Sequence, residues 1–262
     1  MIRYLKTWKI FWETAIGAEM EYRINFLLGI LTALCNLAGS IYINALFYQE
    51  GKTLGGWAWE DGLIVIGLFT FFEGISSTLF SANLSKIITH VQEGTLDFVL
   101  LKPIDSQFWL SFRNFSPWGI PNIILGIGLV IYAGYHREVP LGFTRYLLAV
   151  LPVMFGLLTL YSIWFILGSL SIWFVKIYNV TEVLRTFMAA GRFPLDAFSP
   201  FLRVFFVAVI PIAFLTTVPA QIMLGHDMKQ WLGYSALIAV TLFLFSRWFW
   251  KFALRFYTSA SS

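Results

Sequence analysis

The sequence predicts an all-α, polytopic membrane protein with six transmembrane helices, an N-terminal interfacial helix and a helical cytoplasmic loop, all in one domain over residues 1–262. Of those residues 58% are hydrophobic and only 12% are charged, whereas soluble domains carry about 25% charged residues. The mean hydropathy is +0.75, so there are too few polar side chains for a water-soluble surface. Six long stretches are poor in charge, and Lys and Arg are unevenly distributed between them.

Residues 1–23 predict an amphipathic helix in the membrane interface, because an apolar aromatic face opposes a basic face. The apolar face consists of Tyr4, Leu5, Trp8, Phe11, Trp12, Ala15 and Ile16, and the basic residues are Arg3, Lys6 and Lys9. The alternative is an extension packed on the helical bundle. We expect no cleavable signal peptide, because the first apolar run starts only near Ile24 and is too long.

The six charge-poor stretches are the predicted spans, since a helix needs roughly 20 apolar residues to cross a bilayer. They are residues 24–49, 62–85, 114–135, 146–175, 204–225 and 230–246. The last is the shortest and continues into an amphipathic tail. The fifth contains Pro211 and Pro219, which predict a broken or shortened span with residues 219–229 dipping back at the outer surface. A merely kinked helix is the alternative.

Positive charges predict the orientation, because they are enriched in cytoplasmic loops. One side would hold fourteen Lys and Arg residues: Arg3, Lys6, Lys9, Arg23, Lys86, Lys102, Arg113, Lys176, Arg185, Arg192, Arg203, Arg247, Lys251 and Arg255. The other side would hold four: Lys52, Arg137, Arg145 and Lys229. Both termini and the loops at 83–108 and 176–203 are therefore expected in the cytoplasm. The external connections at 50–61, 136–145 and 226–229 would be short.

No catalytic or cofactor motif is present: there is no Walker A loop, H-E-x-x-H, C-x-x-C or G-x-S-x-G. His90, His136 and His226 fall in separate loops on both predicted faces, so they cannot form one metal site. The chain is not expected to be an enzyme by itself, and any ATPase would be another chain. The net charge of +4 reflects topology and does not indicate nucleic acid binding.

Three polar residues inside the predicted spans are candidate functional groups. Glu73 is the only acidic or basic residue well inside a span, and such a group usually faces the bundle interior or a cavity with a function. It could instead be a neutral, hydrogen-bonded carboxyl or lie near the membrane surface. Asn36 and Asn44 in the first span are expected to join helices by hydrogen bonds.

Residues 83–108 predict two short amphipathic helices joined near Glu93, Gly94 and Thr95, where Gly94 interrupts the helical pattern. Lys102 and Pro103 end the second helix, because the residue before proline disfavours helical backbone angles. A rigid helix–break–helix under the bundle is suited to force transmission. An ordinary amphipathic interfacial loop is the alternative.

Several short motifs resemble the six-span permeases of ABC transporters of the type-two export class. They are residues 93–97 (EGTLD), 100–104 (LLKPI), 191–194 (GRFP), 210–214 (IPIAF) and 218–220 (VPA). Each motif is weak alone. Their order, together with the six-span topology, makes the similarity specific and extends it over essentially the whole chain.

The resemblance implies a permease in the plasma (bacterial inner) membrane that exports a substrate, paired with a second permease chain as a homodimer or heterodimer. It would bind no cofactor directly, because ATP and Mg²⁺ would be held by separate cytoplasmic ATPase subunits. The ATPase-coupling residues would be Lys86, His90, Glu93, Gly94, Thr95, Asp97, Leu101, Lys102 and Pro103. The short external connection predicted after the fifth span departs from the family pattern.

Two other classes of protein remain open on the residues alone. A secondary carrier could use Glu73 for ion coupling, although such carriers often show internal repeats with paired broken helices, and no convincing repeat is present. A membrane scaffold or assembly factor is the other. Nothing in the spans selects a substrate.

Overall fold

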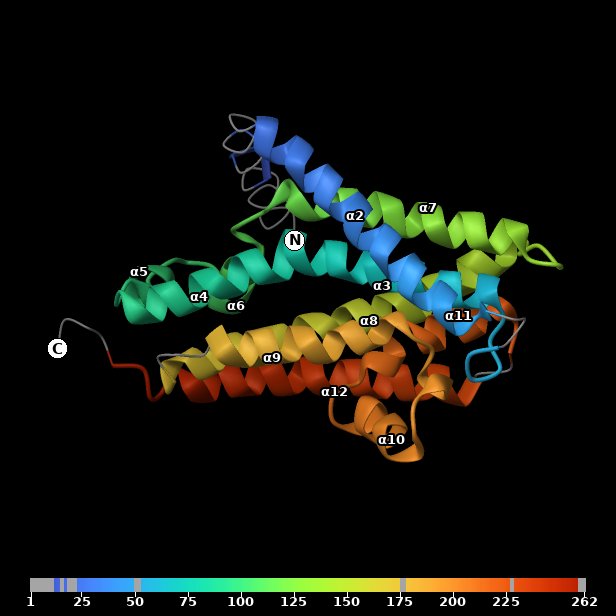
Figure 1. Cartoon of the computed structure of the whole chain (residues 1–262). Coiled ribbons are helices and arrows are strands. Elements are labelled where there is room, and N and C mark those ends of the chain that lie inside the picture. Colours follow the sequence, from blue (N-terminus) through green and yellow to red (C-terminus); the bar gives the residue numbers. More distant parts are fainter. Residues whose placement is uncertain are drawn as a thin grey trace.

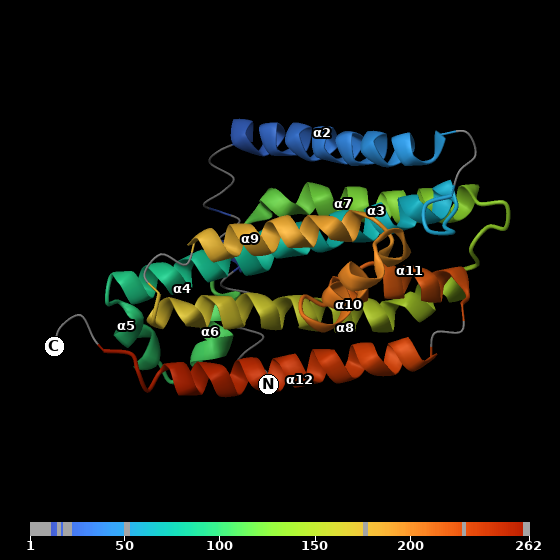
Figure 2. The same cartoon turned by 60° about the horizontal axis from the view of Figure 1, so that its bottom comes forward.

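The computed structural model describes residues 12–14, 17, 23–49, 53–174, 178–226 and 229–258, and helices dominate these ranges (Figure 1). The interfacial helix predicted over residues 1–23 falls mostly outside them. The long helices lie lengthwise, and their connections gather at two ends (Figures 1 and 2). We call these the α5 end, which holds α5, and the α11 end, which holds residues 53–58 and 137–142.

Twelve helical elements carry the described architecture. They are α2 (Arg23–Phe47), α3 (Trp59–Ile75), a π-helical segment (Ser76–Ser81), α4 (Ala82–Gln92), α5 (Leu96–Leu100), α6 (Ser106–Phe112), α7 (Ile120–His136), α8 (Phe143–Ser169), α9 (Tyr178–Met188), α10 (Pro200–Ala208), α11 (Thr217–Leu224) and α12 (Lys229–Ala253). Short 3₁₀ turns connect several of them.

Five helical units are long and apolar enough to cross a membrane: α2, the continuous helix α3 to α4, α7, α8 and α12. They coincide with the first four and the last of the predicted spans. The second unit has 34 residues, which exceeds the roughly 20 needed to cross the bilayer, and it continues to the α5 end. The prediction of an all-α, polytopic membrane protein is confirmed.

The segment predicted as a cytoplasmic loop over residues 176–203 runs the length of the bundle instead. Near its start, Arg185 Nη2 donates a hydrogen bond of 2.8 Å to Ser81 Oγ, beside α4. Near its end, Asp196 Oδ2 accepts a hydrogen bond of 2.9 Å from Trp57 Nε1, just before α3 begins. The segment is therefore antiparallel to the α3–α4 helix and reaches the α11 end. The prediction of a loop at one end was wrong.

By length and composition the possible sixth span is the bent pair Pro200–Ala208 and Ile212–Leu224, within the predicted fifth stretch. The sixth passage of the chain between the two ends is nevertheless made by α9 with the 3₁₀ turn Ala189–Arg192, which is not itself long and apolar enough to be a candidate span. Charge counting missed it because Glu182, Arg185 and Arg192 lie within it. Arg192 lies inside the bundle, with its guanidinium 4.9 Å from the centre of the Phe69 ring. Charged residues are tolerated at membrane depth when they face the bundle interior or a cavity.

The fifth charge-free stretch forms a re-entrant hairpin, the α10–α11 hairpin. Its arms, Pro200–Ala208 and Ile212–Leu224, are bent by 75° at the intervening break. The tip reaches the middle of α8, where the carbonyl of Phe214 lies against Gly156. The second arm returns to the α11 end, where Gly225 lies against the guanidinium of Arg145.

Proline explains the bend only in part. Pro211 lies at the break between the two arms, where the missing backbone N–H removes no helical hydrogen bond. Pro219 lies in the first turn of α11 and does not interrupt it, since the first turn tolerates proline. The part of the chain that dips back is therefore the whole α10–α11 hairpin rather than residues 219–229. The connection at the α11 end is correspondingly longer than predicted and covers residues 193–226 of the described chain.

This arrangement changes the number of Lys and Arg residues at each end, but the α5 end still has the excess. Arg203 moves to the α11 end, Arg192 is partly buried in the bundle, and Arg185 lies on α9 between the two ends with its side chain exposed. Among the described residues, seven Lys and Arg then belong to the α5 end and four to the α11 end. The first turn of α2 and the last turn of α12 both point toward the α5 end (Figure 2), so the described chain starts and finishes on one side.

The closest helix packing joins α3 to the antiparallel α7. Gly67 and Gly74 on α3, seven residues apart, face Gly126 on α7 and Gly119 in the 3₁₀ turn just before it. A methyl group at Gly74 would lie only 2.6 Å from the backbone nitrogen of Ile123. Small residues allow helix backbones to approach this closely, which is how membrane helices gain packing energy without a hydrophobic driving force.

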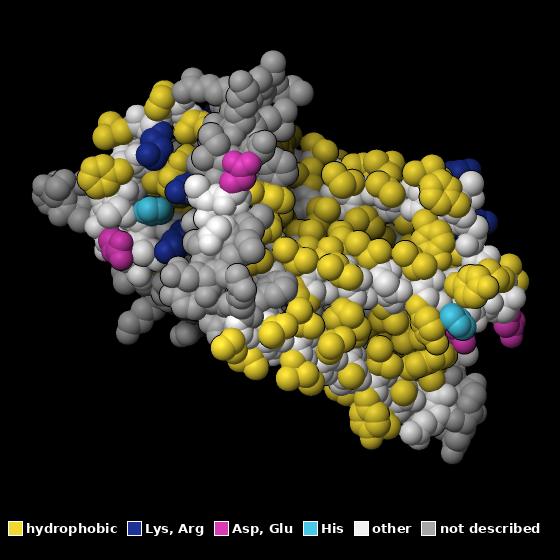
Figure 3. All heavy atoms as spheres, turned by 90° about the horizontal axis from the view of Figure 1, so that it is seen from above, with side chains coloured by type: hydrophobic (Ala, Val, Ile, Leu, Met, Phe, Trp, Pro, Cys, Tyr) yellow, Lys and Arg dark blue, Asp and Glu magenta, His cyan; other side chains and the backbone are white. Residues whose placement is uncertain are grey.

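The molecular surface is divided in the way a bilayer requires. On the face shown in Figure 3, apolar side chains cover the middle of the bundle, and charged side chains gather toward its two ends. The apolar residues that remain exposed are mostly on α2, α7, α8 and α12. Lipid tails can cover these faces, because they are as apolar as the side chains.

Candidate functional site

The break between α4 and α5 lies where the glycine predicts it. α4 ends at Gln92, Glu93 caps it, and Gly94 has a φ of +68°. This left-handed conformation is accessible to glycine without steric cost. Beyond it, Thr95 Oγ1 lies 2.7 Å from Nδ1 of His90, which closes the turn. The predicted helix–break–helix is confirmed as a local structure.

The short helix α5 has one buried and one exposed apolar face. Leu96 and Val99 are buried and belong to a cluster with Ile87 of α4. Phe98 and Leu101 point away, with 68% and 81% of their surfaces exposed. Sequence reasoning selected Leu101 but missed Phe98. The i, i+3 spacing of Phe98 and Leu101, opposite the buried pair, is the signal that could have identified it.

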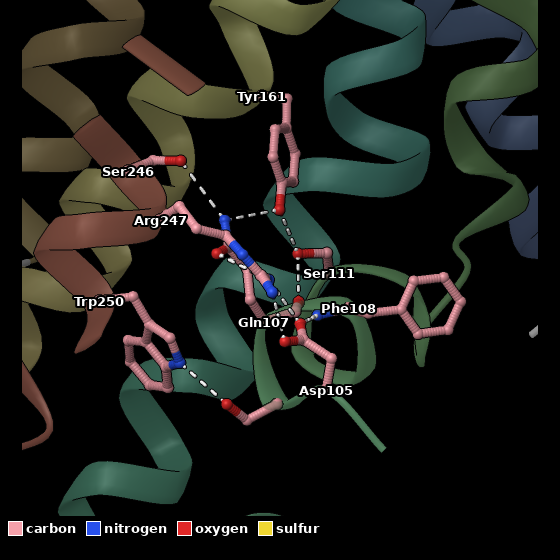
Figure 4. A network of polar contacts seen from close by, with 9 residues as sticks. Asp105, Gln107, Phe108, Ser111, Tyr161, Ser246, Arg247 and Trp250 are labelled. Atoms are coloured by element: carbon pink, nitrogen blue, oxygen red, sulfur yellow. Dashed lines mark hydrogen bonds and ion pairs between the residues drawn. The ribbon is translucent and has the colours of Figure 1, made fainter. Parts of the chain in front are cut away.

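The connection after α5 is fixed to α12 by an ion pair (Figure 4). Arg247 donates from Nη1 to Asp105 Oδ1 and from Nη2 to Asp105 Oδ2, and both distances are 2.7 Å. Asp105 Oδ1 also accepts from the backbone N–H of Phe108 at 2.9 Å and so caps the start of α6. Two-pronged pairing of this kind fixes geometry as well as adding energy.

The ion pair also shifts the acidity of Asp105. Hydrogen bonding to Arg247 is the largest influence and lowers the pKa of the Asp105 carboxyl from its ordinary value of 3.8. Burial opposes the shift, and the Phe108 N–H supports it. The carboxylate is therefore ionised throughout the neutral range.

A second set of hydrogen bonds extends this anchor to α8 (Figure 4). Gln107 Nε2 donates to the Tyr161 hydroxyl at 3.1 Å and to Ser246 Oγ at 3.3 Å. The Tyr161 hydroxyl also lies 2.9 Å from Ser111 Oγ. One buried amide thus joins α6, α8 and α12, which restricts the motion of α6 relative to the spans.

Two further contacts complete the support of the 93–113 connection. Trp250 Nε1 of α12 donates to Ser106 Oγ at 3.0 Å. On the other side, the buried side chain of Asn83 donates to the carbonyl of Asn114 at 2.8 Å and accepts from its N–H at 2.9 Å. The connection is therefore held near both of its ends, while the outer face of α5 stays exposed.

The nine predicted coupling residues lie together at the α5 end but differ in exposure. Five are exposed: Lys86, Glu93, Leu101, Lys102 and Pro103. Four are partly buried: His90, Gly94, Thr95 and Asp97. The Lys102 ammonium lies 5.5 Å from the centre of the Trp109 ring, so it bends back toward α6.

The predicted intramembrane polar residues separate into three environments. Glu73 is partly buried and lines a cavity with Arg185 and Arg192, which is the interior position predicted for it. Asn44 is buried, and its amide donates to the Ser40 carbonyl within the same helix. Asn36 is exposed on α2. For Asn44, the hydrogen bond found is within α2 rather than between helices.

Comparison with known families agrees with this architecture. Residues 34–261 match the sequence profile of a family described as "ABC-2 family transporter protein". The match runs from the middle of α2 through α12 and includes both the α4–α5 break and the α10–α11 hairpin. No curated protein matches the chain.

Proposed function

The chain belongs to the ABC-2 transporter family, and from that premise we propose that it is the permease of an ATP-driven exporter whose ATPase is a separate cytoplasmic chain. As a member of the family it is a multi-pass membrane subunit and not itself an ATPase. ATP and Mg²⁺ would be bound by the partner ATPase. The permease would convert closure of that ATPase into movement of its spans.

One observation carries the coupling part of this proposal. At the α5 end an apolar surface formed by Phe98 and Leu101 is exposed beyond a segment that is held firmly on the bundle. Contiguous exposed apolar patches rimmed by polar residues mark protein or membrane interaction sites. Because Asp105 and Gln107 connect the same segment to α12 and α8, a push on α5 would be transmitted to two spans.

The proposal places the α5 end, and hence both termini, in the cytoplasm of a bacterial inner membrane. The corrected excess of Lys and Arg at this end supports that orientation. We further propose a second permease chain, identical or homologous, within the lipid bilayer. The exposed apolar residues of α2, such as Leu27, Leu31 and Leu34, suit either a second chain or lipid.

The test is co-purification of the tagged permease with its co-expressed ATPase. Simultaneous substitution Phe98→Ala and Leu101→Ala should reduce recovery of the ATPase at least about tenfold, because two exposed apolar anchors of an interface are lost. The matched control is Val139→Ala, which truncates an apolar residue 74% exposed at the α11 end. This control should retain the ATPase.

Equal recovery in the double variant and the wild type would exclude α5 as the docking surface. If no ATPase co-purified with the wild type, while transport in vesicles required a proton gradient and not ATP, the secondary carrier using Glu73 would replace the present proposal. A protein that transports nothing but retains other membrane proteins would be the scaffold of the third hypothesis.

A further inference from the structure

A cavity of about 180 Å³, with a mostly apolar wall that carries several polar side chains, lies between the helices, away from the coupling surface. It is enclosed by α3 with its π-helical continuation, by α7 to α9, and by the tip of the α10–α11 hairpin. The polar side chains in its wall are Glu73, Asn122, Trp164, Arg185, Arg192 and Thr216, with Ser76 and Ser77 on the π-helical segment. π-Helical segments inside α-helices are frequent at functional sites.

Two buried side chains in this wall have polar atoms without a partner. Trp164 is 3% exposed and Thr216 is 1% exposed. Neither Trp164 Nε1 nor Thr216 Oγ1 makes a hydrogen bond, and Nε of Arg192 in the same wall is also unsatisfied. Buried polar groups are almost always hydrogen-bonded. These three atoms in one wall are donors that a bound ligand with acceptor atoms would satisfy.

The charges of the cavity specify what kind of ligand this is. Its wall contains two guanidinium groups and one carboxyl group. Among the described side chains, neither arginine pairs with a carboxylate. Arg185 donates to Ser81 Oγ, and Arg192 lies over the Phe69 ring. Both arginines are thus oriented by neutral partners and retain N–H groups for an anion.

We propose that this cavity binds an oxyanion, a phosphate or carboxylate group, carried either by a free solute or by a lipid headgroup. A guanidinium matches both anions through parallel N–H donors, and Trp164 and Thr216 add two neutral donors. Phe72 and Leu215 in the same wall can pack against an apolar part of the ligand. The inference that this cavity is the substrate site of a transporter rests on the proposed function. The inference that it binds an oxyanion does not.

The test uses the permease in nanodiscs of phosphatidylcholine with two probes, radiolabelled inorganic phosphate and phosphatidylglycerol. Wild type should bind at least one of them saturably. Arg192→Gln should weaken that binding about tenfold or more, and Thr216→Val about threefold, because charged hydrogen bonds contribute more than neutral ones. Glu73→Gln should tighten binding, since it removes a negative charge beside the anion.

The matched control is Arg255→Gln, which removes one exposed positive charge near the C-terminus and should leave binding unchanged. Phosphate binding alone identifies a free solute, phosphatidylglycerol binding alone identifies a headgroup, and binding of both supports the shared chemistry. The proposal is overturned if wild type binds neither probe, or if Arg192→Gln and Thr216→Val bind as wild type does.

Loss of fold and failure of the proposed function are separated by two further readouts. Each variant is checked for an unchanged melting temperature. If Arg192→Gln does not fold, Thr216→Val tests the cavity instead, because valine has about the same size as threonine. ATPase recovery is measured on the same variants. If the permease binds an anion but no ATPase co-purifies with it, only the proposed function is contradicted. If the ATPase co-purifies but no anion binds, only the cavity proposal is contradicted.

Discussion

An aspartate anchors each end of the molecule through a contact about equally distant in the sequence, Asp105 with Arg247 142 residues away and Asp196 with Trp57 139 residues away, but the two ends differ in what these contacts hold. At the α5 end, Asp105 caps α6 locally and pairs with Arg247. At the α11 end, Asp196 accepts from Trp57, 139 residues away, and from Gln221 at 3.4 Å. The first end presents an exposed apolar helix outward, and the second folds a hairpin back into the bundle.

The comparison shows that the two ends suit different tasks. The α5 end is stiff behind an exposed surface, which is what a docking site needs. At the α11 end, α11 packs on the bundle, and the tip of the α10–α11 hairpin reaches into the middle, where Thr216 lines the cavity. Movement of the hairpin would therefore alter the cavity directly, whereas movement of α5 reaches it only through α8 and α12.

The largest effect is expected from a test of which end faces which compartment. In a Cys35→Ser background, single cysteines are introduced by Ser199→Cys, Val139→Cys or Lys102→Cys, all at exposed positions. A membrane-impermeant maleimide should label the first two from outside intact cells. It should label Lys102→Cys only after permeabilisation, because this residue lies beyond α5.

Labelling of Ser199→Cys in intact cells is expected to be either complete or absent, so it decides between the two positions of residue 199. The sequence count placed residue 199 in a cytoplasmic loop with Lys102, whereas the structure places it beside Asp196 at the α11 end. Protection of Ser199→Cys in intact cells, with Val139→Cys labelled, would contradict the re-entrant hairpin. Labelling of Lys102→Cys from outside would instead reverse the proposed orientation.

The two ends also explain what the sequence could and could not predict. The α4–α5 break follows from Gly94, and the end of α5 from Pro103; both act on the adjacent backbone. Five spans were visible as charge-poor runs. The sixth passage between the two ends was not, because α9 keeps Arg185 and Arg192 at the cavity and so lacks a charge-poor run. The α10–α11 hairpin was predicted as a span because Arg203 is the one charged residue among the 25 residues from Pro200 to Leu224.

The site was predictable to a similar extent. Residues of the break were found from a local pattern, but Phe98 was missed because the exposed face at this five-residue helix offers only one i, i+3 pair, Phe98 and Leu101, as a signal. The cavity could not be found either. Its wall combines Glu73, Arg192 and Thr216 from elements whose proximity depends on the re-entrant hairpin, and Glu73 alone carried a signal of interior placement.

A smaller but substantial effect is expected at the α11 end from Asp196→Ala. The change removes the acceptor of the indole N–H of Trp57, a residue that is only 6% exposed. It also removes the acceptor of the Gln221 amide. Losing the acceptor of a buried donor costs about 1–3 kcal/mol, so the free energy of unfolding should fall by about 2 kcal/mol. Thermal or denaturant unfolding of the purified permease in detergent measures the change.

Asp196→Asn is the matched control for this prediction. It keeps an oxygen in place to accept from Trp57 and should recover more than half of the lost stability. Equal destabilisation by the two substitutions would show that the charge, through Arg203 at 3.8 Å, matters more than the hydrogen bond. The ATPase should still co-purify with both variants, because the coupling surface lies at the other end.

The smallest effect on stability is expected at the α5 end from Asp105→Ala. The ion pair with Arg247 has side chains 40% and 31% exposed, so solvent weakens it, and the loss should be about 1 kcal/mol including the cap of α6. A double-mutant cycle with Arg247→Ala measures the pair alone. The coupling energy should be below about 1 kcal/mol, although transport per ATP hydrolysed should fall noticeably if this anchor transmits force.

The pH dependence of the same pair has a definite sign. The pKa of Asp105 is lower in the folded protein than its ordinary value of 3.8, so the carboxylate stabilises the fold fully above that value. The contribution is lost as the pH falls through the lowered pKa. Wild type and Asp105→Asn should therefore differ in stability at neutral pH and converge in acid. A constant difference across the whole range would mean that the charge of Asp105 plays no part, and that only its role as the cap of α6 holds the connection to the spans.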